Sequence, residues 1–250
     1  MSRYDAVLFD VDDTLLDFDA SEQAAFGHVF DECIRVPPGQ RDVFLVMFLR
    51  EHHATWDLYM QGTVLRQDVP RRTFERLSVM GQLGTADPDE AAELFRHWFA
   101  THSVPEPGAL ETLALLHTHC RTGVISNYEL ADEQRARLAG AGLAPLLDIT
   151  VISGDCGCEK PDPAIFRNAL HFLHLGSHRC LYVGDSLRSD AAGARSAGID
   201  FCWYRRHCPS ADVPGITAVA SLAELPSLLG LPSVVDRTRP YPTMEPPGKN

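Results

Sequence analysis

The order in which apolar runs and helical patterns follow one another constrains the fold of this chain more than any other feature. Short apolar runs predict strands at residues 6–11, 122–126, 149–153, 180–183 and 201–204. Amphipathic stretches between and after these runs predict helices at residues 108–119, 130–141, 163–173, 189–197 and 221–229. Such alternation of strands and helices predicts a parallel sheet that is covered by helices on both faces.

The alternation is interrupted once, directly after the first predicted strand. Residues 17–102 have helical patterning, and breakers separate candidate helices at residues 21–35, 41–60, 67–80 and 88–102. We therefore expect an α/β fold with a Rossmann-like parallel-sheet core of residues 1–16 and 104–230. Residues 17–103 would form a helical cap inserted into this core, and the proline-rich residues 231–250 would form a tail.

Charge and composition exclude several classes of partner. The chain carries a formal net charge of −12, whereas a surface that binds nucleic acid is basic. It contains no apolar run of the ~18 residues that a membrane span requires, and acidic residues flank the first apolar run, unlike in a signal peptide. The seven cysteines are scattered without a disulfide framework, which is typical of a reducing compartment. We expect a cytoplasmic protein, monomeric or homodimeric, with no nucleic-acid or membrane partner.

Polar residues follow the predicted strands in four places. The clusters are Asp10 to Thr14, Ser126-Asn127, Lys160-Pro161, and Gly184 to Asp190. In an open parallel sheet, ligands bind beyond the carboxyl ends of the strands, near the point where the strand order reverses. We therefore expect the four clusters to converge on one site, although together they span about 180 residues of the chain.

Asp10 and Asp12 are separated by one residue at the end of a buried strand. In an extended chain, both side chains then lean to the same side. Neighbouring carboxylates repel each other unless a cation lies between them or one of them is protonated. The spacing therefore indicates a cation site, and the alternative is an acidic turn in solvent.

Lys160 stands out because the chain otherwise uses arginine as its cation. Of 22 basic residues, only Lys160 and Lys249 are lysines, and Lys249 is next to last in the chain. A compact ammonium differs from a planar guanidinium in shape and hydration, so its retention indicates a position that needs this shape. Lys160 could neutralise both Asp10 and a phosphate oxygen, and the alternative is a chance surface lysine.

The remaining clusters offer hydroxyl, amide and carboxylate groups. Ser126 and Asn127 could hold a phosphate oxygen, or they could simply form a turn and cap the next helix. Asp185 together with Asp10 could supply carboxylates to Mg²⁺, which prefers oxygen ligands in octahedral geometry. Asp190 either orders the surroundings of the metal or caps the helix that begins there.

These four clusters, in this order, resemble the four motifs of the haloacid dehalogenase superfamily of phosphohydrolases. The resemblance covers roughly residues 5–230, and the insertion after the first motif resembles the family's helical C1-type cap. Phe9 to Phe18, the stretch from Trp56 to Phe74, and Phe201 to Tyr204 resemble the bacterial pyrimidine 5′-nucleotidase-like phosphatases.

The resemblance implies a magnesium-dependent phosphatase that acts on a small phosphorylated metabolite, such as a nucleoside 5′-monophosphate. Asp10 would attack the phosphorus and form an aspartyl-phosphate. Asp12 would protonate the leaving oxygen and then deprotonate the hydrolytic water. Asp10, the backbone carbonyl of Asp12, and Asp185 would hold Mg²⁺.

Further roles follow from the same resemblance. Ser126, Asn127 and Lys160 would position the phosphoryl group, and Thr14 would orient Asp10. Because the dehalogenases of the superfamily lack the second aspartate and use no metal, Asp12 disfavours dehalogenation. The alternative enzyme is a sugar phosphomutase, which returns the phosphoryl group to another hydroxyl, and the alternative from another class is a non-catalytic module that binds phosphate ligands.

Residues of the expected cap offer candidate contacts to the substrate. Arg71 or Arg72 could reach a substrate, although adjacent arginines usually lie on a solvated surface. Phe18, Trp56 and Tyr59 could stack on a base, although aromatic residues in helices more often pack in a core.

Overall fold

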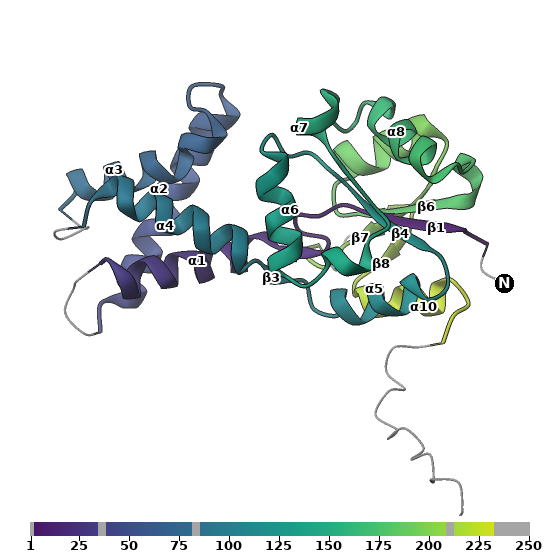
Figure 1. The fold of residues 1–250 in the computed structure, drawn as a ribbon, viewed down its shortest axis with the longest axis horizontal. Helices are drawn as coiled ribbons and strands as arrows, with labels where there is room; N and C mark the ends of the chain where they lie inside the picture. The colour runs from purple at the N-terminus through teal and green to yellow at the C-terminus, as the bar shows by residue number, and fades with distance from the viewer. Residues whose placement is uncertain (1–2, 35–38, 82–85, 209–212, 233–250) are drawn as a thin grey trace, which may run out of the picture.

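The computed structural model describes residues 3–34, 39–81, 86–208 and 213–232, and its core is a six-stranded sheet. Every strand pair in this sheet is parallel, and the strand order is β5-β4-β1-β6-β7-β8 (Figure 1). The strands are β1 (Ala6–Phe9), β4 (Arg121–Ser126), β5 (Ile149–Ile152), β6 (Cys180–Gly184), β7 (Asp200–Tyr204) and β8 (Thr217–Val219). Because β1 lies between β4 and β6, the strand order reverses beside it.

Helices cover both faces of the sheet. Val7 and Phe9 of β1 pack into one apolar cluster with side chains of α5, α6 and α10, while Ala6 and Leu8 pack into another with α8 and α9. The alternation of side chains along a strand explains this division. The core helices are α5 (Ala109–His117), α6 (Ala131–Gly140), α7 (Ser153–Cys156), α8 (Pro163–Leu173), α9 (Ala192–Ala197) and α10 (Leu225–Leu228), with 3₁₀ turns at Ala144–Leu146, Ser177–Arg179 and Leu222–Glu224.

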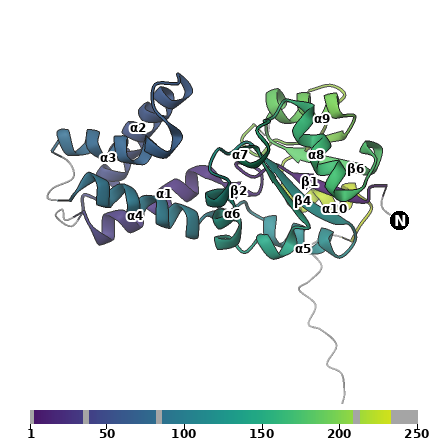
Figure 2. The same cartoon turned by 45° about the horizontal axis from the view of Figure 1, so that its top comes forward.

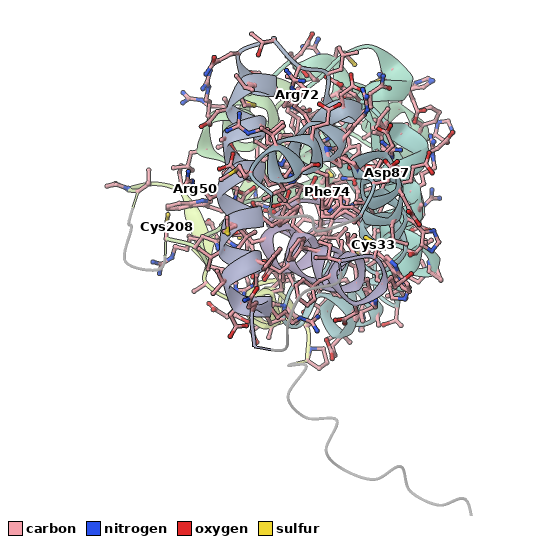
Figure 3. All side chains as sticks on the ribbon, turned by 90° about the vertical axis from the view of Figure 1, so that its left-hand side faces the viewer. Cys33, Arg50, Arg72, Phe74, Asp87 and Cys208 are labelled. Atoms are coloured by element: carbon pink, nitrogen blue, oxygen red, sulfur yellow. The ribbon has the colours of Figure 1, made fainter. Side chains whose placement is uncertain are left out.

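Four further helices form the inserted cap, which lies to one side of the core (Figures 1 and 2). Phe26 stacks on Phe48 with 4.2 Å between ring centroids, and Phe74 and Phe95 belong to the same buried cluster. Figure 3, which views the molecule from the cap side, shows Phe74 among the helices and Arg72 near the outer edge. The cap helices are α1 (Phe18–Glu32), α2 (Arg41–Met60), α3 (Val69–Val79) and α4 (Pro88–Thr101), with a 3₁₀ turn at Arg66–Asp68.

Two short strands connect the cap to the core. β2 (Leu16–Asp17) and β3 (Val104–Pro105) pair antiparallel where the chain leaves the core and returns to it. The side chain of Asp17 caps α1 by accepting a first-turn N–H at 2.9 Å. Ser21 was expected to begin this helix, but it lies inside the helix, and its hydroxyl accepts the N–H of Val104 at 2.9 Å. The helix starts three residues earlier because Asp17 supplies the cap.

The α/β class, the parallel sheet and the inserted helical cap expected from the sequence are confirmed. The helix expected at residues 189–197 begins instead as a π-helical turn at Leu187–Ala191 and continues as α9. The limits 17–103 for the cap stay a prediction, and of the expected tail only residues 231 and 232 lie within the described residues. None of the helices in the described ranges is long and apolar enough to cross a membrane.

Candidate active site

The carboxyl ends of β1, β4 and β6 bring the expected polar residues together. Asp10 follows β1, and its backbone N–H donates to the carbonyl of Val183 in β6 at 2.9 Å. Ser126 ends β4, and Asp185 follows β6. Lys160 reaches the same place from the loop between α7 and α8, and its Nζ donates to Asp10 Oδ1 at 2.5 Å.

Acceptors surround the ammonium of Lys160. Its Nζ lies 2.8 Å from Asp190 Oδ1 and 3.1 Å from the hydroxyl oxygen of Tyr182, and the side chain is 2% exposed. Asn127 holds the loop that carries this lysine. The Asn127 amide oxygen accepts the Lys160 N–H at 2.7 Å, and its amide nitrogen donates to the Lys160 carbonyl at 2.8 Å. Asn127 thus fixes the backbone from which the ammonium extends.

The π-helical turn carries Asp190 into the site. Its Oδ2 accepts the N–H of Ser186 at 3.0 Å, and its side chain is fully buried. Ser186 rather than Asp190 caps the turn, since its hydroxyl accepts the N–H of Ser189 at 3.2 Å. A Cβ at Gly184 would lie 2.4 Å from Asp190 Oδ2, so the approach of this carboxylate to β6 requires a glycine there. Such π-helical turns are frequent at functional sites.

Burial and mutual repulsion shift the proton affinities of this cluster. Burial raises the pKa of Asp10 well above its ordinary value; Lys160 opposes this shift, and Asp190 and Asp185 add to it. Burial, with Asp190 as the next cause, raises the pKa of Asp185 to about 7. Burial would lower the pKa of Lys160, but the charges of Asp10 and Asp190 outweigh it and raise the pKa. Lys160 therefore remains a cation, and a single cation is too few for three carboxylates.

The donors of the site fit a divalent metal ion. One oxygen from each of Asp10, Asp185 and Asp190 lies within 4.8 Å of the other two. Both oxygens of Asp190 already have partners, so Asp10 and Asp185 are the carboxylates of this group that remain to hold an ion. Oxygen donors with surplus negative charge are what Mg²⁺ requires. The residues present therefore fit the metal that the sequence implied.

Ser126 and Thr14 are both buried beside this cluster, with different partners. Ser126 Oγ accepts a side-chain N–H of Gln134 at 2.9 Å. Thr14 was expected to orient Asp10, but its hydroxyl has no hydrogen-bond partner among the described residues. The bond from Lys160 and the backbone bond to β6 hold Asp10 instead.

Asp12 turns toward α6. Its Oδ1 accepts a hydrogen bond from Arg137 Nη1 at 2.6 Å, and its Oδ2 accepts one from Gln134 Nε2 at 3.2 Å. Sequence reasoning missed both partners. Arg137 is fully buried, whereas Arg135 on the same helix is 43% exposed and pairs with Asp132 at the surface. Nothing in the sequence pattern separates the two arginines.

The cap faces the site through Arg66, which sequence reasoning also missed. Its guanidinium carbon lies 3.8 Å from the centroid of the Tyr128 ring and 4.8 Å from that of the Trp56 ring. Burial would lower the pKa of Arg66, but Tyr128 and Asp12 raise it. Trp56, Arg66 and Tyr128 line a pocket between the cap and the core. One residue of this pocket, Arg66, interacts through its charge with Asp12.

The two arginines that were considered for substrate contact lie on the outer surface of the cap. Arg71 pairs with Asp89 at 2.6 Å, and Arg72 pairs with Glu75 at 3.0 Å. Figure 3 shows Arg72 near the outer edge of the cap. The charges of Arg71 and Arg72 are thus engaged with acidic residues of the cap itself.

Comparison with known proteins relates the chain to one enzyme family. The family model of the haloacid dehalogenase-like hydrolases matches residues 4–198. The pyrimidine 5′-nucleotidase YjjG of Escherichia coli is 30% identical over 239 residues, which cover 91% of this chain and 98% of that protein. The pyrimidine 5′-nucleotidase PynA of Streptococcus pneumoniae is 28% identical, over 82% of this chain and 85% of that protein.

Solved structures share the whole architecture. Magnesium-bound YfnB of Bacillus subtilis superposes with a TM-score of 0.69 at 26% identity, over 92% of this chain and 100% of that chain. A 2-haloacid dehalogenase from Pseudomonas syringae superposes with a TM-score of 0.59 at 25% identity, over 94% of this chain and 100% of that chain. The core and its cap are thus an arrangement that this chain shares with a magnesium-bound hydrolase and with a dehalogenase.

Proposed function

Because the chain belongs to the haloacid dehalogenase-like hydrolases and is a phosphatase of that family, we propose that it hydrolyses a small phosphomonoester through an aspartyl-phosphate on Asp10. The observation that carries this proposal is the buried Asp10 carboxylate, 2.5 Å from Lys160 and grouped with Asp185. A carboxylate nucleophile can approach an anionic phosphate only where cations offset the charge of both.

The reaction divides between Asp10 and Asp12. Asp10 attacks the phosphorus, so that a new P–O bond forms while the P–O bond to the leaving group breaks. Protonated Asp12 gives its proton to the leaving oxygen. Water then attacks the phosphorus of the aspartyl-phosphate, Asp12 accepts a proton from that water, and the bond to Asp10 breaks. Inorganic phosphate leaves, and Asp12 is protonated again for the next cycle.

Other residues hold the reacting groups in place. Lys160 keeps a positive charge beside Asp10 and the transferring oxygens, and Asp190 fixes its ammonium at 2.8 Å. Ser126 offers its hydroxyl to a phosphoryl oxygen. Mg²⁺ held by Asp10, Asp185 and the Asp12 backbone carbonyl would offset the negative charge of nucleophile and phosphate.

Phosphate release from p-nitrophenyl phosphate tests this proposal. We expect activity with Mg²⁺, loss of activity with EDTA, and a loss of at least about 1,000-fold in Asp10→Asn. Asp132→Asn is the matched control, since Asp132 is an exposed carboxylate whose ion pair, among the residues that the structure describes, is with Arg135. Wild-type phosphatase activity in Asp10→Asn would contradict the proposal.

The proposed substrate is a nucleoside 5′-monophosphate. Two relatives are named pyrimidine 5′-nucleotidases. The flat guanidinium of Arg66 lies close to both the Trp56 and the Tyr128 ring, which is the environment in which a planar base would stack. We expect Trp56→Ala to raise KM for the best nucleotide about tenfold and to leave p-nitrophenyl phosphate unaffected. Trp98→Ala, which removes a cap tryptophan outside this pocket, is the control.

Product analysis distinguishes the other reactions. A sugar phosphomutase would isomerise a sugar phosphate without releasing phosphate, and a dehalogenase would release chloride from 2-chloropropionate in the presence of EDTA. A non-catalytic module would bind phosphate esters without turnover.

A reducing cytosol is the proposed location, in keeping with seven cysteines that are all free thiols.

A further inference from the structure

The carboxylate of Asp12 is held at both oxygens by one face of α6. Arg137 Nη1 contacts Oδ1 at 2.6 Å, and Gln134 Nε2 contacts Oδ2 at 3.2 Å. Gln134 and Arg137 are three residues apart on a helix, so their side chains are neighbours. We call these two residues the α6 clamp.

The clamp has a defined internal orientation. Arg137 Nη1 also donates to Gln134 Oε1 at 2.8 Å. Because a guanidinium only donates hydrogen bonds, this contact fixes the amide oxygen of Gln134 on the arginine side. The amide nitrogen must then face Asp12 and the hydroxyl of Ser126, which lies at 2.9 Å. Gln134 therefore connects the expected acid–base residue with the expected phosphate-binding serine.

Arg137 is also attached to the junction of cap and core. Its Nε donates to Ser103 Oγ at 3.1 Å, directly before β3. Its guanidinium carbon lies 4.3 Å from the centroid of the Phe99 ring in α4. One buried side chain thus contacts the Asp12 carboxylate, the returning chain of the cap and a cap helix.

A contribution to folding stability does not explain why Arg137 is buried. Its side chain is fully buried, and its Nη2 has no hydrogen-bond partner among the described residues. Burying a charge with incomplete pairing is costly, and a well-packed apolar side chain often stabilises a protein as well or better. The contact that remains to account for its burial is the one with Asp12, whose side chain is 25% exposed.

We propose that Gln134 and Arg137 are positioning residues that hold the Asp12 side chain for proton transfer in both steps of the reaction. This inference rests on the proposed phosphatase function. Gln134 sets the distance between Asp12 and the phosphate-binding Ser126, and Arg137 ties Asp12 to the cap junction at Ser103. In this scheme both clamp residues act through the Asp12 carboxylate, and neither contacts the substrate.

The leaving group provides the test, because p-nitrophenolate leaves without a proton whereas the alkoxide of a nucleoside needs one. In Arg137→Met, we expect kcat for the best nucleoside monophosphate to fall about 100-fold, with KM within about twofold of wild type. The first turnover of p-nitrophenyl phosphate should keep its wild-type rate. It should appear as a burst of p-nitrophenolate, followed by slow turnover, because hydrolysis of the aspartyl-phosphate still needs Asp12.

Two further variants keep the test decisive. Arg135→Met removes an exposed arginine from the same helix and should leave both substrates unaffected. If circular dichroism shows that Arg137→Met is not folded, Gln134→Met replaces it in the test. We expect the same burst and slow turnover of p-nitrophenyl phosphate in that variant. Two results with Arg137→Met would contradict the proposed role of the clamp. One is wild-type kcat on both substrates, and the other is loss of the p-nitrophenolate burst together with turnover. Absence of a phosphoenzyme in the wild-type protein would overturn the proposed function, and the clamp with it.

Discussion

Gly184 ends β6, and the absence of a side chain there leaves room for the Asp190 carboxylate. In Gly184→Ala, the new Cβ would lie 2.4 Å from Asp190 Oδ2, so this carboxylate must move away from Lys160. We expect phosphatase activity to fall at least about tenfold, because Lys160 loses one of its two anionic partners. Steady-state kinetics on p-nitrophenyl phosphate measure this. Gly27→Ala is the control, since its Cβ meets only the flexible end of Arg41; equal activity losses in both variants would contradict the argument.

Lys160 is a residue at which even replacement by another cationic residue should lower kcat. Asp10, Asp190 and Tyr182 accept from a single nitrogen in a pocket that leaves 2% of the side chain exposed. A guanidinium is planar and larger, and it cannot direct its donors to three acceptors around one point. We expect Lys160→Arg to lose at least about 100-fold in kcat. Arg167→Lys, the reverse exchange at an exposed position of α8, should leave kcat unchanged; near-wild-type activity of Lys160→Arg would refute the argument.

At the residue scale, the sequence was informative where the chemistry is tied to a strand end. Asp10, Lys160 and Asp185 were expected to converge because strand ends of a parallel sheet meet at one edge, and the structure brings them together. Arg137 was not found, because Arg135 on the same helix is indistinguishable from it in a local pattern. Which of the two arginines is buried depends on how α6 packs against α4 and the cap junction.

At the element scale, a cluster of buried phenylalanines packs the helices of the cap together. Phe74 of α3 is fully buried, with ring centroids 5.7 Å from Phe48 and 6.1 Å from Phe95. We expect Phe74→Ala to lower the free energy of unfolding by about 3–5 kcal/mol, because it removes a large side chain and leaves a cavity. Urea denaturation measures this loss.

Val79→Ala is the matched control on the same helix, since Val79 is 90% exposed. Its effect should stay within about 0.5 kcal/mol. A similar loss in both variants would contradict the packing argument, because alanine has a higher helix propensity than valine or phenylalanine and neither loss could then be assigned to the Phe74 contacts.

Element prediction succeeded where a pattern was long enough to be read. The 20 residues of α2 have the bounds expected from the sequence, from Arg41 to Met60. The strands β2 and β3 contain two residues each, which is too short to display an alternating pattern, so they were missed. β2 and β3 pair because the chain returns from the cap to the core beside the point where it left. This is a tertiary contact that a local sequence pattern does not show.

At the scale of the whole molecule, the site is assembled from both parts of the chain. The core contributes the carboxylates and Lys160, while the cap contributes Arg66 and Trp56 to the adjoining pocket. Arg137 contacts both parts through Asp12 and Phe99. A change in the position of the cap would therefore alter the pocket and the surroundings of Asp12 together.

Metal binding should stabilise the whole protein in a pH-dependent way. In the metal-free protein, the Asp185 carboxyl keeps its proton up to a pKa of about 7, because burial penalises its charge, whereas the unfolded chain releases it near 3.8. Between these values the folded state binds more protons, so this group makes the free energy of unfolding fall as pH rises. Mg²⁺ needs the ionised carboxylate, so it must displace this proton at low pH and binds without that competition at high pH.

We therefore expect Mg²⁺ to raise the melting temperature more at pH 8 than at pH 5.5. A concentration a hundredfold above the dissociation constant stabilises by about 2.7 kcal/mol, which is about 5–10 °C for a chain of this size. Differential scanning fluorimetry at both pH values, with and without Mg²⁺, measures the shift. Asp185→Asn should raise the melting temperature of the metal-free protein at pH 8, because a neutral amide is buried in place of a charge, and should remove most of the Mg²⁺ effect. An equal Mg²⁺ shift at the two pH values, or a full shift in Asp185→Asn, would show that the ion binds elsewhere.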